Sequence, residues 1–234
     1  MSEMGFDFGE AFAGRPLKFF WLLDVSDSMN HDGKIASLNQ AIRSCIKPMQ
    51  DVAEDNPEAQ MFVRAIKFSS GASWHIAQDT PVESFVWNDL SATGWTAMGE
   101  ALKLLAKEVT VDKMPERGLP PVFVLITDGQ PTDNFDEGLS ALLAEPWAMK
   151  AVRIAIGIGR DANMEILEKF CSDPEVPPLR ADNAASLTNF IRWVSTKVVA
   201  NVSKPPSQVA GQSSGGNVPL PPPPPPLASA ADVW

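Results

Sequence analysis

The sequence predicts an α/β fold: a doubly wound, mostly parallel central sheet with one antiparallel edge strand and helices on both faces. Three apolar runs of strand length support this prediction, at residues 18–23, 121–127 and 151–157. Runs that are apolar on both faces are typical of parallel strands covered by helices on both sides. Stretches of helical periodicity lie between these runs, and an alternation of strands and helices favours a layered α/β sandwich.

The remaining elements follow in chain order. After the first run, one helical stripe ends at Asn56-Pro57 and comprises Ile35, Leu38, Ile42, Cys45, Met49 and Val52. Two strand-like runs, MFVRAIKF and ASWHIA, are joined by SSG, a short turn that favours an antiparallel edge pair. A second helical stripe comprises Met98, Ala101, Leu102, Leu105 and Val109. A third comprises Leu187, Phe190, Ile191, Val194 and Val198.

The composition divides the 234 residues into three parts. Residues 17–202 are expected to form one domain, preceded by an N-terminal extension at 1–16 and followed by a flexible proline-rich tail at 203–234. The tail contains six consecutive prolines, Pro221–Pro226, behind a Gly/Ser/Gln spacer. Such a segment buries too little surface to offset its ordering entropy, and the prolines favour polyproline II. Three roles stay open: a solubilising end, a docking peptide, or a cis ligand whose carboxylates occupy a metal site.

Charge and cysteine content limit the functional classes. A formal charge of −10 and a pI near 4.7 argue against nucleic acid or an anionic membrane as a partner, because both need a basic face. Cys45 and Cys171 lie among apolar residues, which favours core filling in a reducing compartment over a disulfide. The start of the chain lacks a signal-peptide pattern and no run is long enough to span a membrane, so we expect a cytoplasmic protein.

Polar side chains gather where two predicted strands end. Asp24, Ser26 and Ser28 alternate after the first apolar run, and Asp128 follows the run PVFVLIT. Neighbouring parallel strands lie about 4.8 Å apart, so these side chains are expected to share one crevice. Repulsion and desolvation of two close carboxylates would be offset by a divalent cation. Oxygen donors alone favour Mg²⁺, with Mn²⁺ or Ca²⁺ as alternatives. The same residue types also suit turns and helix caps, which is the simpler alternative.

Three segments resemble a known family. DVSDS at 24–28, TGWTAMGEAL at 93–102 and LITDGQPTD at 125–133 resemble the metal-ion-dependent adhesion site of von Willebrand factor type A (vWA) domains. The resemblance implies that Ser26, Ser28 and Thr96 bind the metal through hydroxyls. It further implies that Asp24 and Asp128 usually act through water, and that one open position takes a partner's Asp or Glu carboxylate.

Within this superfamily, the segments are most similar to bacterial intracellular TerY-like proteins associated with tellurium resistance. The resemblance implies an interaction module, an adaptor or scaffold without enzymatic activity, whose partner is a protein kinase or a PP2C-type phosphatase. Two positions depart from the family pattern: Asp27 stands where glycine is common, and Trp95 where a small residue is common. Trp95 and Met98 are expected near the rim of the site, where Trp95 either anchors a partner or caps the core.

Other functions are less well supported. A metal-dependent phosphatase of the haloacid dehalogenase type also begins with a strand-end Asp, but needs an acid two residues later, where this chain has Ser26. GIGRDA at 157–162 matches a nucleotide-binding fingerprint, although its position late in the chain favours a tight strand-to-helix turn. His31 is expected to be an exposed loop residue, Thr93 a weaker candidate than Thr96, and Asp133 and Asp136 helix-start carboxylates.

Overall fold

The computed structural model describes residues 14–204, 220–227 and 234. Within them, six strands form one sheet in the order β3-β2-β1-β4-β5-β6. The strands are β1 (Arg15–Asp24), β2 (Ala59–Phe68), β3 (Ala72–Pro81), β4 (Val122–Thr127), β5 (Val152–Ile158) and β6 (Leu179–Ala181). All neighbours pair in parallel except β2 and β3, which are antiparallel. The predicted fold class, with its antiparallel edge strand, is therefore confirmed.

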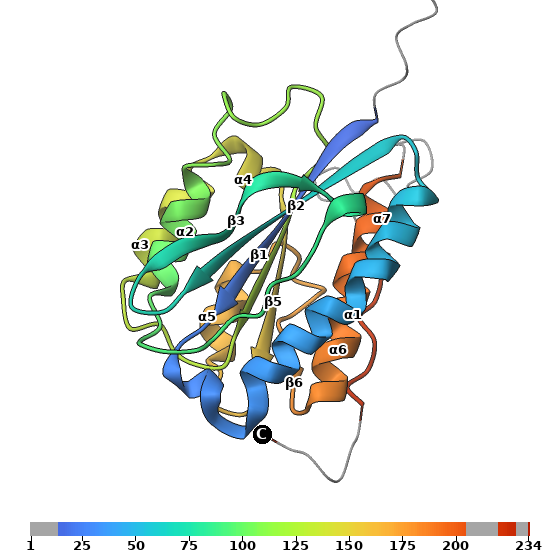
Figure 1. The fold of residues 1–234 in the computed structure, drawn as a ribbon. Helices are drawn as coiled ribbons and strands as arrows, with labels where there is room; N and C mark the ends of the chain where they lie inside the picture. Colours follow the sequence, from blue (N-terminus) through green and yellow to red (C-terminus); the bar gives the residue numbers. More distant parts are fainter. Residues whose placement is uncertain (1–13, 205–219, 228–233) are drawn as a thin grey trace, which may run out of the picture.

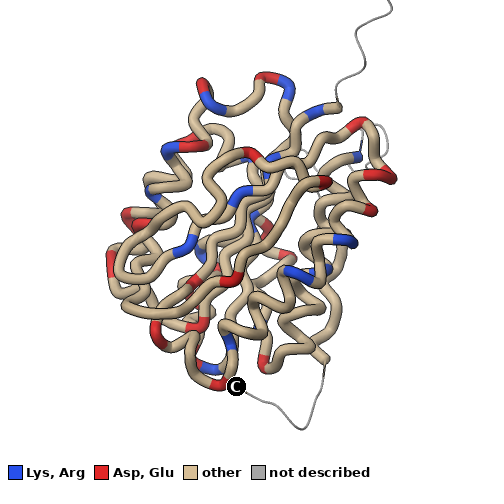
Figure 2. The backbone as a smooth tube through the Cα atoms, viewed as in Figure 1, with Lys and Arg blue, Asp and Glu red and all other residues tan. Residues whose placement is uncertain are grey.

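Helices cover both faces of the sheet (Figure 1). One face is covered by α1 (Lys34–Glu54), α6 (Ala184–Trp193), the π-helical turn η3 (Val194–Val198) and α7 (Val199–Val202). The other is covered by α2 (Met98–Ala106), α3 (Phe135–Leu143), α4 (Pro146–Lys150) and α5 (Met164–Phe170). Two short 3₁₀ segments, η1 (Asp27–Gly33) and η2 (Val82–Ser84), follow β1 and β3. Charged residues of both signs are spread over the outer surfaces (Figure 2).

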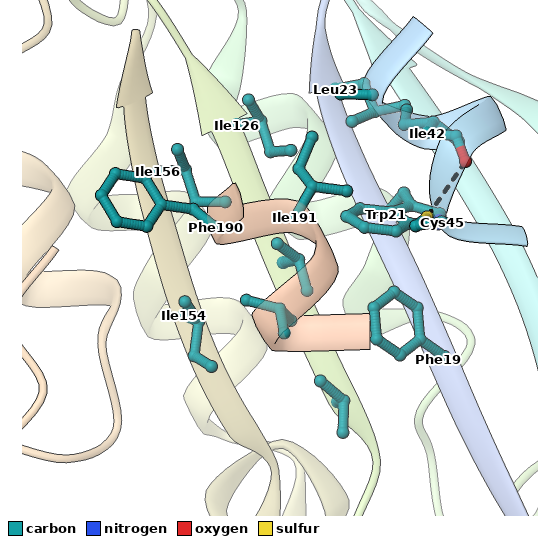
Figure 3. Close-up of a cluster of buried hydrophobic side chains, with 14 of the residues drawn as sticks. Phe19, Trp21, Leu23, Ile42, Cys45, Ile126, Ile154, Ile156, Phe190 and Ile191 are labelled. Atoms are coloured by element: carbon teal, nitrogen blue, oxygen red, sulfur yellow. Dashed lines mark hydrogen bonds between the residues drawn. The ribbon is translucent and has the colours of Figure 1, made fainter. Parts of the chain in front are cut away.

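The central strand β1 is covered on both faces, which explains its apolar run at residues 19–23. Phe19, Trp21 and Leu23 face α1 and α6, whereas Phe20 and Leu22 face α2 and its neighbours. Figure 3 shows the first of these layers, in which side chains of β1, β4 and β5 meet Ile42 and Cys45 of α1 and Phe190 and Ile191 of α6. The three predicted helical stripes thus lie in the core. Both cysteines are free, as predicted, and burial raises the pKa of Cys45 to about 12.

The domain limits stay predictions, because β1 begins at Arg15, α7 ends at Val202, and most of both flanking segments lies outside the described residues. Part of the proline-rich segment is described, however, and it lies against the domain: Leu220 packs on the core cluster under α1 and α6. Within the described residues, no helix combines the length and apolar character that a membrane crossing requires.

Candidate metal centre

The candidate site lies where β1 and β4 end side by side. Leu23 pairs with Ile126, so the next residues, Asp24 and Thr127, are neighbours across the two strands. The chain then turns away from the sheet at both strand ends, because η1 follows Ser26 and a loop follows Asp128. This is the carboxyl edge of a parallel sheet, where α/β proteins of this type bind ligands.

Hydrogen bonds hold the polar side chains of the two strand ends together. The Ser26 and Ser28 hydroxyl oxygens lie 3.0 Å apart, and the Ser28 hydroxyl donates to Asp128 Oδ1 at 2.7 Å. The Ser26 backbone N–H donates to Asp24 Oδ1 at 2.8 Å. Four of the five predicted ligands therefore form one connected network.

Thr96, the fifth predicted ligand, comes from the loop before α2. A Cβ atom placed on Gly129 would lie 3.7 Å from the Thr96 hydroxyl and 3.9 Å from the Ser28 hydroxyl. These two hydroxyls therefore border the same point, and the absence of a side chain at Gly129 leaves the space in front of them open. Two hydrogen bonds fix the loop: Thr132 N–H donates to Thr96 O at 2.9 Å, and Thr96 N–H donates to the Thr132 hydroxyl at 3.1 Å.

A tight connection brings the first and second segments together. Asp27 N–H donates to Gly94 O at 2.9 Å, and Thr93 N–H donates to Val25 O at 2.7 Å. Gly94 has φ +85°, and a Cβ there would lie 2.5 Å from the Ser70 hydroxyl, so only glycine fits this turn. The three segments that the sequence singled out thus meet at one place.

The two carboxylates of the site are both buried. Burial raises the pKa of Asp24 from its usual 3.8 to about 6, although hydrogen bonds from Thr127 and Ser26 lower it; the nearby charge of Asp128 adds a further upward effect. Within the described residues, three or more acidic, His or Cys side chains do not gather anywhere as a metal site. A cation at this edge would therefore depend on the hydroxyls together with Asp24 and Asp128.

Two residues of the site were missed by sequence reasoning. The buried Thr127 hydroxyl donates to Asp24 Oδ2 and accepts from Gly129 N–H at 3.2 Å. Lys34, the first residue of α1, is 5% exposed and places its ammonium 2.8 Å from Asp128 Oδ2. A lysine in the first turn of a helix opposes the helix dipole, and this unfavourable position was the signal that could have revealed a role for Lys34.

The structure also places the remaining residues that the sequence analysis considered. Met98 is fully buried against the core, so its predicted place at the rim is wrong, whereas Trp95 is 70% exposed. Asp133 accepts the Gly99 and Glu100 N–H groups and thus caps α2, while Asp136 lies in the first turn of α3. Thr93 and His31 are exposed.

The GIGRDA segment forms the predicted turn between β5 and α5. Gly159 has φ +75°, and a Cβ on Gly157 would lie within 2.9 Å of Met164 and Ala162. The two glycines therefore serve a left-handed turn and close strand-to-helix packing.

Solved structures share this fold at low sequence identity. A von Willebrand factor type A protein from Catenulispora acidiphila matches with TM-score 0.57 and 18% identity, over 78% of this chain and 42% of that one. Proximal thread matrix protein 1 from the mussel byssus, with a zinc-occupied metal-ion-dependent adhesion site, matches with TM-score 0.56 and 19% identity, over 81% and 46%. The chain thus spans less than half of the length of these two structures.

BatB from Bacteroides thetaiotaomicron matches with TM-score 0.52 and 17% identity, over 80% of this chain and 96% of that one. A sequence search of curated proteins found no match. The family model described as the von Willebrand factor type A domain matches residues 20–193. The chain therefore belongs to the von Willebrand factor type A domain family.

Proposed function

We propose that this chain is a metal-dependent protein interaction module that binds a carboxylate of its partner through a divalent cation. The observation that supports this most is the meeting of three hydroxyls and two buried carboxylates from three separate segments at one sheet edge. The cation would be Mg²⁺, with Mn²⁺ or Ca²⁺ as alternatives.

The donor set fits such an ion. In an octahedral site with metal–oxygen distances of about 2.1 Å, adjacent ligands lie about 3.0 Å apart, and the Ser26 and Ser28 oxygens have this separation. By the family pattern, Ser26, Ser28 and Thr96 would hold the ion, with Asp24 and Asp128 around them. The ion itself would supply a Lewis-acidic position for a carboxylate.

The local charge also suits an acidic ligand. Asp24, Asp128 and Lys34 together carry one net negative charge when all three are ionised. A divalent cation would turn this into one net positive charge in a buried setting, where a carboxylate is attracted strongly. Trp95, exposed beside Thr96, would add an aromatic anchor to the same interface.

The three segments further support a TerY-like bacterial protein that acts in the cytoplasm as an adaptor, with a role in tellurite or stress response. Its partner would be a protein that presents an Asp or Glu, such as a protein kinase or PP2C-type phosphatase. No catalytic role is proposed. The phosphatase alternative lacks support, since the residue two positions after Asp24 is Ser26, which cannot serve as its general acid.

The metal part of the proposal is tested by calorimetric titration with Mg²⁺ and Mn²⁺. Thr96→Ala and the double variant Ser26→Ala/Ser28→Ala should abolish binding, while Thr93→Ala, an exposed threonine of the same loop, should bind normally. Cation at about a hundredfold over Kd should add about 2.7 kcal/mol to the free energy of unfolding. Unchanged affinity in the double serine variant would refute the ligand assignment.

The partner part is tested by capture experiments with and without chelator. Binding should require the cation and should be lost when one acidic residue of the partner is neutralised. Trp95→Ala should weaken binding by about 2 kcal/mol or more if the indole is a hot spot. A partner that binds equally well in chelator would place the interface elsewhere on the domain.

A further inference from the structure

The last described residues of the chain bind to the domain through buried polar side chains. Leu227 O accepts from Asn183 Nδ2 at 3.1 Å and from the Ser186 hydroxyl at 3.2 Å, and Leu227 N–H lies 3.1 Å from the same hydroxyl. Asn183 and Ser186 are only 4% and 1% exposed, and Asn183 also caps α6. Two buried polar side chains thus bind the backbone of Leu227.

The segment Leu220–Leu227 runs along the α1 and α6 side of the domain. Leu220 packs on the core cluster beneath these helices, and Leu227 borders a groove of about 400 Å³ lined by Ser37 and Gln40 of α1 and Asn189 and Arg192 of α6. The prolines between the two leucines lack N–H groups and are already extended, so they lose little entropy on docking. A proline-rich segment therefore loses little conformational entropy when it binds at this surface.

Trp234 lies at the carboxyl edge of the sheet, beside η1 and the start of α1 (Figure 1). Its indole N–H donates to Asp32 O at 3.0 Å, and its backbone N–H donates to Asp182 O at 3.0 Å. A Cβ placed on Gly159 would lie 3.3 Å from Trp234 Cβ. The terminal tryptophan therefore contacts the loops that follow β1, β5 and β6.

Trp234 and Lys34 meet at the same glycine. The Cβ position on Gly159 lies 3.7 Å from Lys34 Cε and 3.8 Å from Lys34 Nζ, as well as close to Trp234. The indole also bonds Asp32, which has φ +53° and leads through Gly33 into Lys34. Trp234 thus lies around the same glycine as Lys34 and binds the turn that leads into Lys34, and Lys34 in turn pairs with Asp128.

We propose that the edge of the α1–α6 groove at Asn183 and Ser186, together with the loops around Gly159, forms a binding site for a proline-rich peptide followed by an aromatic residue, and that the chain's own residues 220–227 and Trp234 occupy it. Through Trp234, the bound tail holds Lys34 against Asp128 and so weakens cation binding at the candidate metal centre. The second statement rests on the proposed function, whereas the first does not. A partner that displaces the tail would strengthen cation binding.

The peptide site is tested without any metal, on full-length protein in chelator. A fluorescently labelled synthetic peptide of residues 219–234 should bind the Trp234→Ala protein at least about tenfold more tightly than the wild type, whose own tethered tail competes at an effective concentration of about millimolar. Trp147→Ala, which removes another half-buried tryptophan, on α4 at the opposite face of the sheet, should behave as the wild type. A peptide that itself carries Trp234→Ala should bind neither protein well. Equal binding of the labelled peptide to all three proteins, or to none, would overturn the proposal.

The link to the metal centre is tested by Mn²⁺ calorimetry. Trp234→Ala should raise the Mn²⁺ affinity by about threefold or more, because the Lys34 ammonium is held less firmly beside Asp128. In a Lys34→Met background, the same tail substitution should change nothing. An unchanged affinity in the first comparison, or an equal gain in both backgrounds, would refute the link. Absence of Mn²⁺ binding in every variant would refute the proposed function and leave the peptide result standing.

Discussion

The ends of β1 and β4 carry one buried carboxylate each, but the protein compensates them differently. Asp24 is bonded by neutral groups, the Ser26 N–H and the Thr127 hydroxyl, and burial raises its pKa to about 6. Asp128 is bonded by the Ser28 hydroxyl and by the ammonium of Lys34. Of the two carboxylates, Asp128 is thus paired with a cationic side chain, whereas Asp24 has only neutral hydrogen-bond partners.

The largest effect on stability is expected when the ion pair of Lys34 and Asp128 is broken. Asp128→Ala leaves the ammonium of Lys34 buried without its carboxylate, and removal of one partner of a buried pair destabilises by about 3–5 kcal/mol. Urea denaturation of the metal-free protein measures this directly.

The control is the double variant Lys34→Met/Asp128→Ala, which removes both charges. Replacement of a whole buried pair by apolar groups is often close to neutral, so most of the lost stability should return. If the double variant is as unstable as the single one, the pair is not what stabilises the end of β4.

The second effect is the pH dependence that Asp24, which has no cationic partner among its hydrogen bonds, gives to stability. Because the folded pKa of Asp24 lies above its unfolded value, the native state binds more protons, and stability falls as pH rises from about 4 to above 6. At neutral pH, where Asp24 is ionised, the shift of its pKa from 3.8 to about 6 lowers the free energy of unfolding by about 3 kcal/mol.

Asp24→Asn should therefore make the metal-free protein more stable than the wild type at pH 7 and flatten its profile between pH 4 and 6. Saturating Mg²⁺ should raise the free energy of unfolding of the wild type at pH 7 and leave that of the variant unchanged. Denaturation curves in chelator and in Mg²⁺ decide this, and a less stable metal-free Asn variant would contradict it.

The third effect is expected when the ammonium of Lys34 is removed. Lys34→Met should lower the stability of the metal-free protein, because Asp128 loses its partner, yet raise Mn²⁺ affinity at least about tenfold, since a unit charge within a few Å repels the incoming ion. Lys67, a lysine at the end of β2, provides a matched control in Lys67→Met. Lower Mn²⁺ affinity in Lys34→Met would mean that the ammonium aids the ion instead of opposing it.

The sequence predicted most of the fold because periodicity reports burial directly. The apolar run of β1 has two buried faces, and its residues alternate between the two helical layers as that pattern requires. The short helix α4 was not predicted, and α5 was expected only as the helix that follows the GIGRDA turn, since five and seven residues hold too few turns to show a stripe. Met98 was misplaced because a helix stripe does not show where the rim ends and the core begins.

For the site, the sequence predicted which motif residues come together but not the long side chains that contact them. Asp24, Ser26, Ser28 and Asp128 come together because adjacent parallel strands end at the same edge, a consequence of topology. Contacts of long side chains have no such signature: Lys34 and Asp128 are far apart in sequence, and only the folded chain shows that they pair. The same holds for Trp234, whose bonds to Asp32 and Asp182 join positions far apart in sequence.

The smallest effect concerns a third carboxylate, Asp27, which stands where the family commonly has glycine. Asp27 is exposed and accepts from Asn30 Nδ2 at 3.1 Å, so solvent screens it, unlike Asp24 and Asp128. Asp27→Gly should therefore reduce Mn²⁺ affinity only about twofold at low salt, and this difference should vanish near 0.5 M salt, where the Debye length falls to about 4 Å. Calorimetry at two ionic strengths measures both values. A large, salt-independent loss would mean that Asp27 belongs with the two buried carboxylates as part of the cation site, and the contrast between buried and exposed acids at this edge would fail.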